Sequence, residues 1–141
     1  SMPLQVLAEL GSAAASATES IIPLLGDPLT AMYAVRALGA IGAKSTLPHL
    51  RPMLADRDTE LRAEATKALG LLGDTESCAQ LEARLNDRNE SVDVRVGAAF
   101  GLLCLGTHPG ASAYLDEREA KKDYHEPTLM RLREQLAARA E

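Results

Sequence analysis

The side chains best suited to chemistry in this sequence are three histidines and two cysteines, and their spacing matches no catalytic or metal-binding motif. His49, His108 and His125 fall in different predicted elements, with no Ser/His/Asp or Cys/His arrangement. Cys78 and Cys104 lack the spacing of metal ligands and are too few for a disulfide framework, so we predict that both pack as small apolar residues. We therefore predict that the chain is not an enzyme and uses no cofactor and no metal.

Composition predicts that helices position these residues. Of the 141 residues, 46% are hydrophobic but only 3% are aromatic, and abundant Ala and Leu favour closely packed helices in a single domain. A net charge of −5 argues against binding to phosphate backbones, so we predict no nucleic-acid partner. No apolar run approaches the roughly 20 residues that cross a bilayer, and no secretory signal is evident. We expect no membrane association and a cytoplasmic location.

A phrase rich in Ala, Leu and Gly recurs three times along the chain. Its closing glycines, Gly42, Gly73 and Gly106, lie 31 and 33 residues apart, a period typical of stacked supersecondary units. In the middle unit, leucines at helical spacing precede and follow a short turn, which predicts a helix, a turn and a second helix. Asp58 or Thr59 is predicted to cap the second helix, and Gly73 to end it in a left-handed conformation.

Prolines predict irregular first helices. Pro23 and Pro52 occupy equivalent places near the ends of the first helices of their units, where each removes a hydrogen bond and predicts a kink. In the first unit, Asp27 is predicted to cap the second helix, with Pro28 at its first position.

This pattern of a leucine-spaced first helix, an Asp-containing turn, an Arg and Ala-Leu-Gly-x-Leu-Gly resembles HEAT repeats over residues 17–106, more closely the short HEAT-like repeats of the bilin-lyase type. The resemblance implies an all-α fold, a right-handed superhelical solenoid of antiparallel helix pairs, with about three full repeats plus caps. It also implies a ladder of contacts between successive repeats, made by the turn Asp and the second-helix Arg. The matching residues are Asp56 with Arg62 and Asp87 with Arg95.

The predicted domain covers residues 3–141, and Ser1–Met2 has the appearance of a tag-cleavage remnant. A clipped helix, Leu4 to Leu10 followed by Gly11, predicts a half-repeat cap. The predicted divisions are the cap at 3–16, the repeats at 17–42, 43–73 and 74–106, and C-terminal capping helices at 107–141. The capping helices are predicted to turn Tyr114 and Leu115 inward, and then Leu129, Leu132 and Leu136 after Pro127.

The second helices line one face of such a stack, and their positions outside the leucine core predict a concave binding surface. The predicted partner-binding residues are Tyr33, Arg36, Glu64, Lys67, Leu71 and Phe100, with Val96, Gly97 and Cys104 beside them. Two interpretations of its apolar part stay open. Either Leu71 and Phe100 form an exposed patch that contacts a partner, or the last helix folds back over it.

These observations predict a non-catalytic scaffold or adaptor that binds a protein or peptide on the concave face, as a monomer or weak homo-oligomer. The alternative is a subunit of a bilin-lyase-like enzyme, in which Arg36 and Lys67 would pair with tetrapyrrole propionates. The resemblance to HEAT-like DNA glycosylases is disfavoured by the net charge. His125-Glu126 resembles the dipeptide that deoxyhypusine hydroxylase repeats around its di-iron site, but one copy cannot supply enough ligands.

Overall fold

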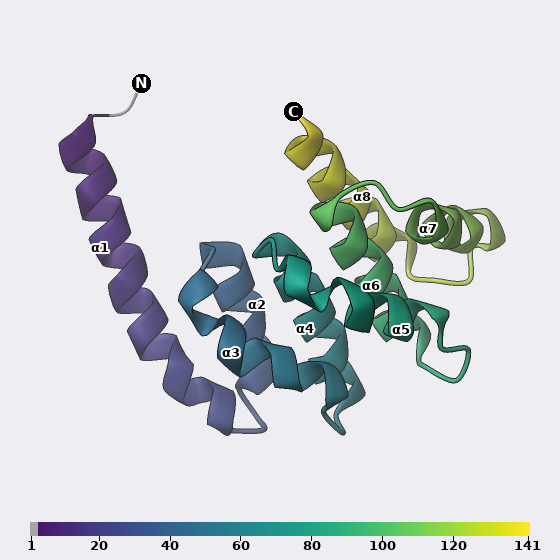
Figure 1. The fold of residues 1–141 in the computed structure, drawn as a ribbon, viewed down its shortest axis with the longest axis horizontal. Coiled ribbons are helices and arrows are strands. Elements are labelled where there is room, and N and C mark those ends of the chain that lie inside the picture. The colour runs from purple at the N-terminus through teal and green to yellow at the C-terminus, as the bar shows by residue number, and fades with distance from the viewer. Residues whose placement is uncertain (1–2) are drawn as a thin grey trace.

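The computed structural model describes residues 3–141, and every regular element in that range is a helix (Figure 1). The predicted tag remnant, Ser1–Met2, lies outside the described residues. The α-helices are α1 (Leu4–Ile21), α2 (Ala31–Ile41), α3 (Leu47–Leu50), α4 (Thr59–Leu71), α5 (Cys78–Asn86), α6 (Val92–Leu105), α7 (Pro109–Lys121) and α8 (Glu126–Ala140). Short 3₁₀ helices are η1 (Ile22–Gly26), η2 (Lys44–Thr46), η3 (Arg51–Ala55) and η4 (Thr75–Ser77).

The second helices of the three units stack side by side. Helix α4 contacts α2 on one side and α6 on the other, while α3 with η3 packs on α4, and α5 packs on α6 (Figure 1). One continuous apolar core therefore runs through the stack, with Leu38, Leu69 and Phe100 all fully buried in it. This is the all-α solenoid of helix pairs that the sequence predicts.

The recurring phrase carries two glycines with different structural roles. The closing glycines Gly42 and Gly73 have φ values of 83° and 71°, the left-handed conformation that ends α2 and α4 as predicted. The inner glycine Gly70 allows close helix packing, because a Cβ atom there would overlap the backbone of Gly101 on α6. A Cβ at Gly39 would lie 3.1 Å from Ala68, so α2 and α4 are packed less tightly at that point.

Both predicted kinks appear as changes of helix type. Pro23 and Pro52 lie in the first turns of η1 and η3, directly after α1 and α3. Since proline has no N–H to donate and its ring clashes with the preceding turn, the α-helical hydrogen bonding stops there and a tighter 3₁₀ segment continues the chain.

Helix capping follows the prediction in the middle unit and departs from it in the first. The Asp58 side chain accepts hydrogen bonds from the N–H groups of Glu60 and Leu61 at the start of α4. In the first unit α2 begins only at Ala31, so the placement of Pro28 at its first position is wrong. Asp27 instead closes a turn, in which its side chain accepts the N–H of Leu29 at 2.9 Å.

The predicted helix end at Gly11 is also wrong, because α1 runs unbroken from Leu4 to Ile21, across the predicted boundary at residue 16. A glycine inside a helix costs only about 1 kcal/mol, and the alanines that follow Gly11 are strong helix formers. Nothing packs against Gly11 to impose a turn.

The C-terminal helices enclose α6. Beyond Asp93 and Arg95 near its start, this helix is apolar on all sides and contacts α4, α5, α7 and α8, which is the expected setting for a helix without a polar face. As predicted, α7 buries Tyr114 and Leu115, and α8 buries Leu129 and Leu132. The arrangement leaves α2 as the second helix with the most exposed inner face.

Candidate functional site

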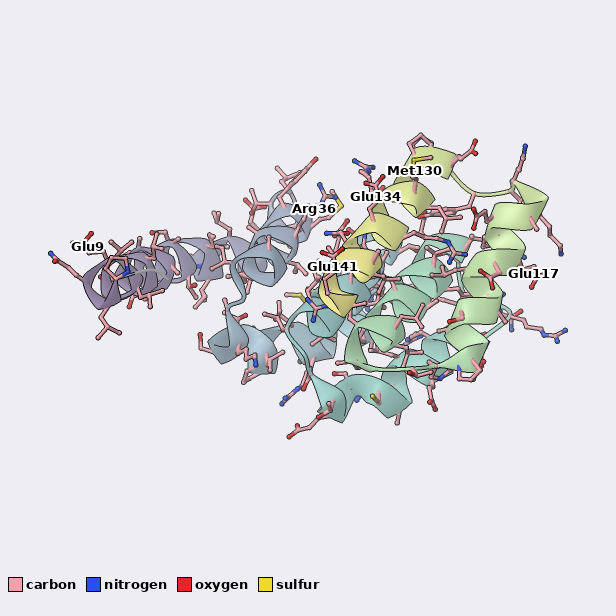
Figure 2. The ribbon with its side chains drawn as sticks, turned by 90° about the horizontal axis from the view of Figure 1, so that it is seen from above. Glu9, Arg36, Glu117, Met130, Glu134 and Glu141 are labelled. Atoms are coloured by element: carbon pink, nitrogen blue, oxygen red, sulfur yellow. The ribbon has the colours of Figure 1, made fainter. Side chains whose placement is uncertain are left out.

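A groove of about 780 Å³ lies between α8 and the inner faces of the second helices. The residues that line it include Arg36, Glu64, Lys67, Leu71 and Phe100 on the second helices, and Thr128, Arg131, Glu134 and Gln135 on α8. Figure 2 shows Arg36 on α2 beside the part of α8 that carries Glu134. The structure thus brings together five of the six predicted concave-face residues, and Tyr33 lies next to Arg36 at the rim.

One buried carboxylate organises the cationic side of this groove. Glu64 is only 8% exposed, and a single oxygen, Oε1, accepts hydrogen bonds from Arg36 Nη2 at 2.8 Å and Lys67 Nζ at 3.2 Å. Burial raises the pKa of Glu64, but the Arg36 hydrogen bond and the charges of both cations outweigh it, so the pKa lies below its usual value. The cluster therefore holds two positive charges around one negative charge.

The rim formed by α2 is open to solvent. The Tyr33 side chain is 60% exposed, and its ring lies 5.6 Å from the guanidinium of Arg36, within the range of a cation–π contact. Because Arg36 itself is half exposed, its remaining N–H donors are accessible from the groove. An aromatic ring and a guanidinium with spare donors form a surface typical of binding hot spots.

The opposite wall carries polar groups of α8 and of the segment before it. Arg131 is exposed and donates to the hydroxyl of Thr128 at 3.3 Å. Burial and the neighbouring Asp93 carboxylate raise the pKa of Tyr124, so this phenol stays neutral at physiological pH. The groove thus combines apolar side chains with three cations, Arg36, Lys67 and Arg131, and three carboxylates, Glu64, Asp93 and Glu134.

The structure decides between the two interpretations for Phe100, because the last helix covers it, whereas Leu71 keeps exposed surface in the groove. Phe100 has no exposed surface and packs in the same core cluster as Leu129 and Leu132 of α8. Val96 and Gly97 are buried as well, Gly97 against Thr66 and the Ala63 carbonyl of α4. The accessible part of the predicted surface is therefore the part over α2 and α4.

The predicted side-chain pairs of the Asp–Arg ladder are wrong, because these residues make other contacts. Arg62 does link two repeats, but its carboxylate partner is Glu90 of the next turn, at 2.8 and 3.1 Å, and from Asp56 it contacts the backbone carbonyl. The Asp56 and Asp87 carboxylates instead accept N–H groups two residues further on, closing their own turns. Arg95 donates to the Leu85 carbonyl and lies over the ring of Tyr114.

The links between repeats follow another pattern, which sequence reasoning missed. An arginine of one repeat reaches a carboxylate 23 or 28 residues further along the chain: Arg36 to Glu64, Arg51 to Asp74, and Arg62 to Glu90. The carboxylates are nearly buried, and the Arg hydrogen bonds lower the pKa values of Asp74 and Glu90. The equal spacing of 28 residues in two of the pairs is the signal that could have revealed them.

A model of HEAT repeats matches residues 18–103, more than half of the chain. The chain belongs to the HEAT-repeat family. No match was found among curated proteins. HEAT repeats generally mediate protein–protein interaction and are typically non-catalytic scaffolds. Among residues 3–141, no helix combines the length and apolar character that a membrane crossing requires.

Two histidines of this HEAT-repeat chain lie at helix starts, and His108 caps its helix. His108 Nδ1 accepts the N–H of Ala111 at the beginning of α7, and His125 lies within 2.7 Å of the Thr128 hydroxyl at the beginning of α8. In the described range, no three His, Cys, Asp or Glu side chains are grouped as metal ligands. Burial raises the pKa of the Cys104 thiol to about 11, so it is a poor nucleophile at neutral pH.

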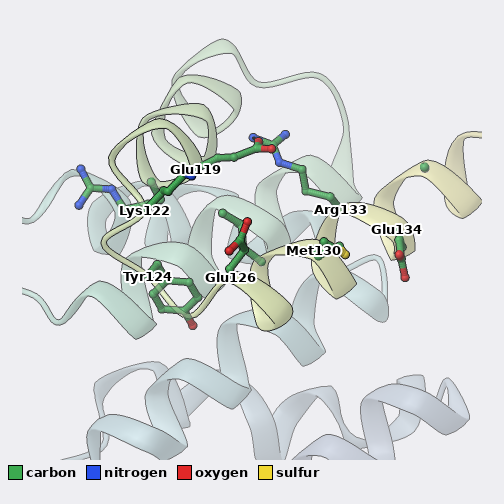
Figure 3. Close-up of a pocket in the computed structure, with 10 residues that line it drawn as sticks. Glu119, Lys122, Tyr124, Glu126, Met130, Arg133 and Glu134 are labelled. Atoms are coloured by element: carbon green, nitrogen blue, oxygen red, sulfur yellow. The ribbon is translucent and has the colours of Figure 1, made fainter.

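A smaller cavity of about 280 Å³ lies between α7 and α8 of the HEAT-repeat domain (Figure 3). Leu129 and Met130 line it, together with charged side chains around its mouth. Arg133, which lies at that mouth, already pairs with Asp116 at 2.6 Å and Glu119 at 3.1 Å. The groove over α2 and α4 is the better candidate site, because it is the larger of the two and gathers five of the predicted concave-face residues.

Proposed function

We propose that this HEAT-repeat chain is a non-catalytic scaffold that binds a protein or peptide in the groove between α8 and the inner faces of α2 and α4. The observation that carries the proposal is the meeting of Arg36, Lys67 and Leu71 in one groove, with the exposed Tyr33 ring beside Arg36. Tyr and Arg are the residues most enriched at binding hot spots. A cytoplasmic location is part of this proposal.

The chemistry of the groove favours an amphipathic segment as the ligand. Leu71 offers an apolar contact, and the spare N–H donors of the half-exposed Arg36 favour hydrogen-bond acceptors of a peptide beside it. The bilin-lyase alternative gains no support from this geometry. The groove offsets its three cations with the carboxylates of Glu64, Asp93 and Glu134, which disfavours a ligand that presents propionates.

Site-specific photo-crosslinking tests the proposal. A photoreactive phenylalanine analogue is placed at Gln135, which lines the groove, or at Tyr33, which lies beside Arg36, and in a matched control at Gln80, an exposed position on α5. Each variant is incubated with extract of the source cells and irradiated. We expect the same protein to be crosslinked from both groove positions and not from Gln80.

A substitution sharpens the result. Tyr33→Ala combined with Arg36→Ala should reduce capture of that protein by at least about tenfold, the loss expected for hot-spot side chains. Equal crosslinking from Gln80, or capture that the double variant leaves unchanged, would place binding elsewhere and refute the proposal. Crosslinks to a second copy of the chain are scored separately.

A further inference from the structure

The cavity between α7 and α8 has an apolar wall that the proposed function leaves unused (Figure 3). Its apolar lining residues on α8 are Leu129, Met130 and Ala137. The side chain of Met130 is 57% exposed, so a long and flexible apolar group of this wall is in contact with water. A ligand that covered Met130 would be stabilised by the removal of this apolar surface from water.

Tyr124 adds an aromatic ring to the same wall. The residue lines both the cavity and the groove, but its hydroxyl forms a hydrogen bond with Asp93, which lines the groove and not the cavity. Figure 3 shows this hydroxyl pointing away from Glu119 and Arg133, which also line the cavity. The ring is therefore the part of Tyr124 that a ligand in the cavity can contact. An aromatic ring and a thioether sulfur together favour an aromatic ligand, through ring stacking and sulfur–ring contacts.

Charge gives no advantage to an ionic ligand in this cavity. The lining contains three cations and three carboxylates, which are Arg118, Lys122, Arg133, Glu119, Glu126 and Glu134. Each of the two arginines already forms ion pairs with two carboxylates of α7 or of the segment that follows it. An ion of either sign would meet like charges as well as opposite charges, and it would lose part of its hydration on entry. The lining therefore favours a ligand without net charge.

The volume of the cavity sets the size of such a ligand. The cavity measures about 280 Å³. A cavity of about 150 Å³ is enough to hold one benzene molecule. A molecule of two fused rings therefore fits, and a largely apolar wall with a few polar groups is the usual composition of a small-molecule site.

We propose that the cavity between α7 and α8 binds an uncharged aromatic molecule of about two fused rings. The ligand contacts the Tyr124 ring and the Met130 sulfur, and Leu129 and Ala137 complete the apolar surface around it. The site is distinct from the groove, since Tyr124 and Glu134 are the only lining residues that the two share. The inference does not depend on the proposed function of the groove.

Methyl NMR of the full chain tests the proposal, with 2-naphthol as an uncharged probe. The methionine methyl groups are labelled with carbon-13, and the Met130 signal is assigned through Met130→Leu. We expect this signal to shift saturably as 2-naphthol is added, because the ring current of a bound aromatic molecule acts on methyl groups beside it.

Analogues of the probe test the two chemical requirements separately. The anion 2-naphthoate and the cation 2-naphthylmethylammonium should each bind at least about tenfold more weakly than 2-naphthol, because the lining favours neither charge. Decahydro-2-naphthol has the same carbon skeleton without aromatic rings, and it should bind at least about threefold more weakly.

A pair of variants locates the binding site. Ala137→Trp fills the cavity from α8 and should weaken binding of 2-naphthol at least about tenfold. Ala140→Trp places the same side chain at the end of α8, outside the cavity lining, and should leave binding unchanged. Both alanines are exposed, so the fold is expected to persist, which circular dichroism checks.

Three outcomes would overturn this inference: a Met130 signal that does not shift saturably, binding that Ala137→Trp leaves unchanged, or a charged or non-aromatic analogue that binds as tightly as 2-naphthol. None of these measurements involves a protein partner, so failure of this inference is distinguishable from failure of the proposed function.

Discussion

The two ends of the concave face present the same structural position in opposite settings. Arg36, Lys67 and Phe100 each lie six residues before a closing glycine of the repeated phrase. Arg36 is half exposed, Lys67 is three-quarters covered, and Phe100 is fully buried beneath the C-terminal helix. At this position of the repeated phrase, the side chain is charged on α2 and α4 and aromatic on α6, where α8 takes the place of solvent.

The covered end of the concave face therefore contributes to stability, and the open end is available for binding. A repeat array needs a covered end because each repeat buries its apolar surface on its neighbours, and the last one has no successor. Here α7 and α8 supply that cover, and α8 occupies the inner face of α6 in doing so. The inner faces of α2 and α4 are left for ligands. The following variants test this division, from the largest expected effect to the smallest.

Replacing Phe100 or Tyr33 by alanine should show most strongly how the covered and open ends of the concave face differ. Phe100→Ala should lower the free energy of unfolding by about 3 to 5 kcal/mol, because it leaves a cavity under α8, whereas Tyr33→Ala should change it by less than about 0.5 kcal/mol. Urea unfolding followed by circular dichroism measures both. Equal costs would mean that α8 does not cover the inner face of α6.

Inner glycines of the phrase probe how tightly neighbouring second helices pack. Gly70→Ala should cost about 1 to 3 kcal/mol, since its Cβ would overlap the backbone of Gly101. Gly39→Ala should stay within about 1 kcal/mol of wild type, because its contacts with Ala68 are looser and alanine favours the helix. Thermal unfolding of the two variants gives the comparison, and a costlier Gly39→Ala would reverse the assigned packing.

Lowering the pH should destabilise the open half of the molecule, because Glu64 becomes protonated. Its lowered pKa means that the ionised carboxylate stabilises the fold above the usual pKa of 4.5, and that this contribution disappears as pH falls through the lower pKa of the folded state. Glu64→Gln should therefore cost about 1 to 2 kcal/mol at pH 7, given that Arg36 is half exposed. In urea unfolding the difference between the variant and wild type should shrink as the pH is lowered below 4.5, whereas a difference that stays constant would assign the loss to packing.

Reactivity of Cys104 reports on the covered half without altering it. In a Cys78→Ser background, iodoacetamide should modify Cys104 at pH 7.5 at least about tenfold more slowly in the native chain than in urea, because burial raises its pKa to about 11. Mass spectrometry follows the reaction. Native labelling as fast as unfolded labelling would mean that α8, which places Arg139 near this thiol, opens readily.

The stack and most of the groove could be predicted from the sequence because both depend on local, repeated signals. The closing glycines set the register of the second helices, which places Arg36, Lys67 and Leu71 on one face. Gly11 shows the limit of such signals, since a glycine ends a helix only where the surrounding structure makes use of its left-handed conformation.

The features that could not be predicted depend on contacts between residues that are far apart in the sequence. Nothing near Phe100 in the sequence indicates that a helix about 30 residues later will cover it. Nor does the sequence around Glu64 show that Arg36 lies within 2.8 Å of it. The predicted partners of Asp56 and Asp87 are wrong because the turns that contain these residues offer nearer hydrogen-bond donors than the next repeat does.

The arginine links between repeats give the array a direction. Asp74 and Glu90 are almost fully covered, while their donors Arg51 and Arg62 keep more contact with water. Removal of repeats from the C-terminal side would leave arginines that water can solvate. Removal from the N-terminal side would separate the nearly buried Asp74 from Arg51, which is more costly, whereas Glu64 and Glu90 would keep Lys67 and Arg84 of their own repeats. The direction of the links therefore matters most at Asp74.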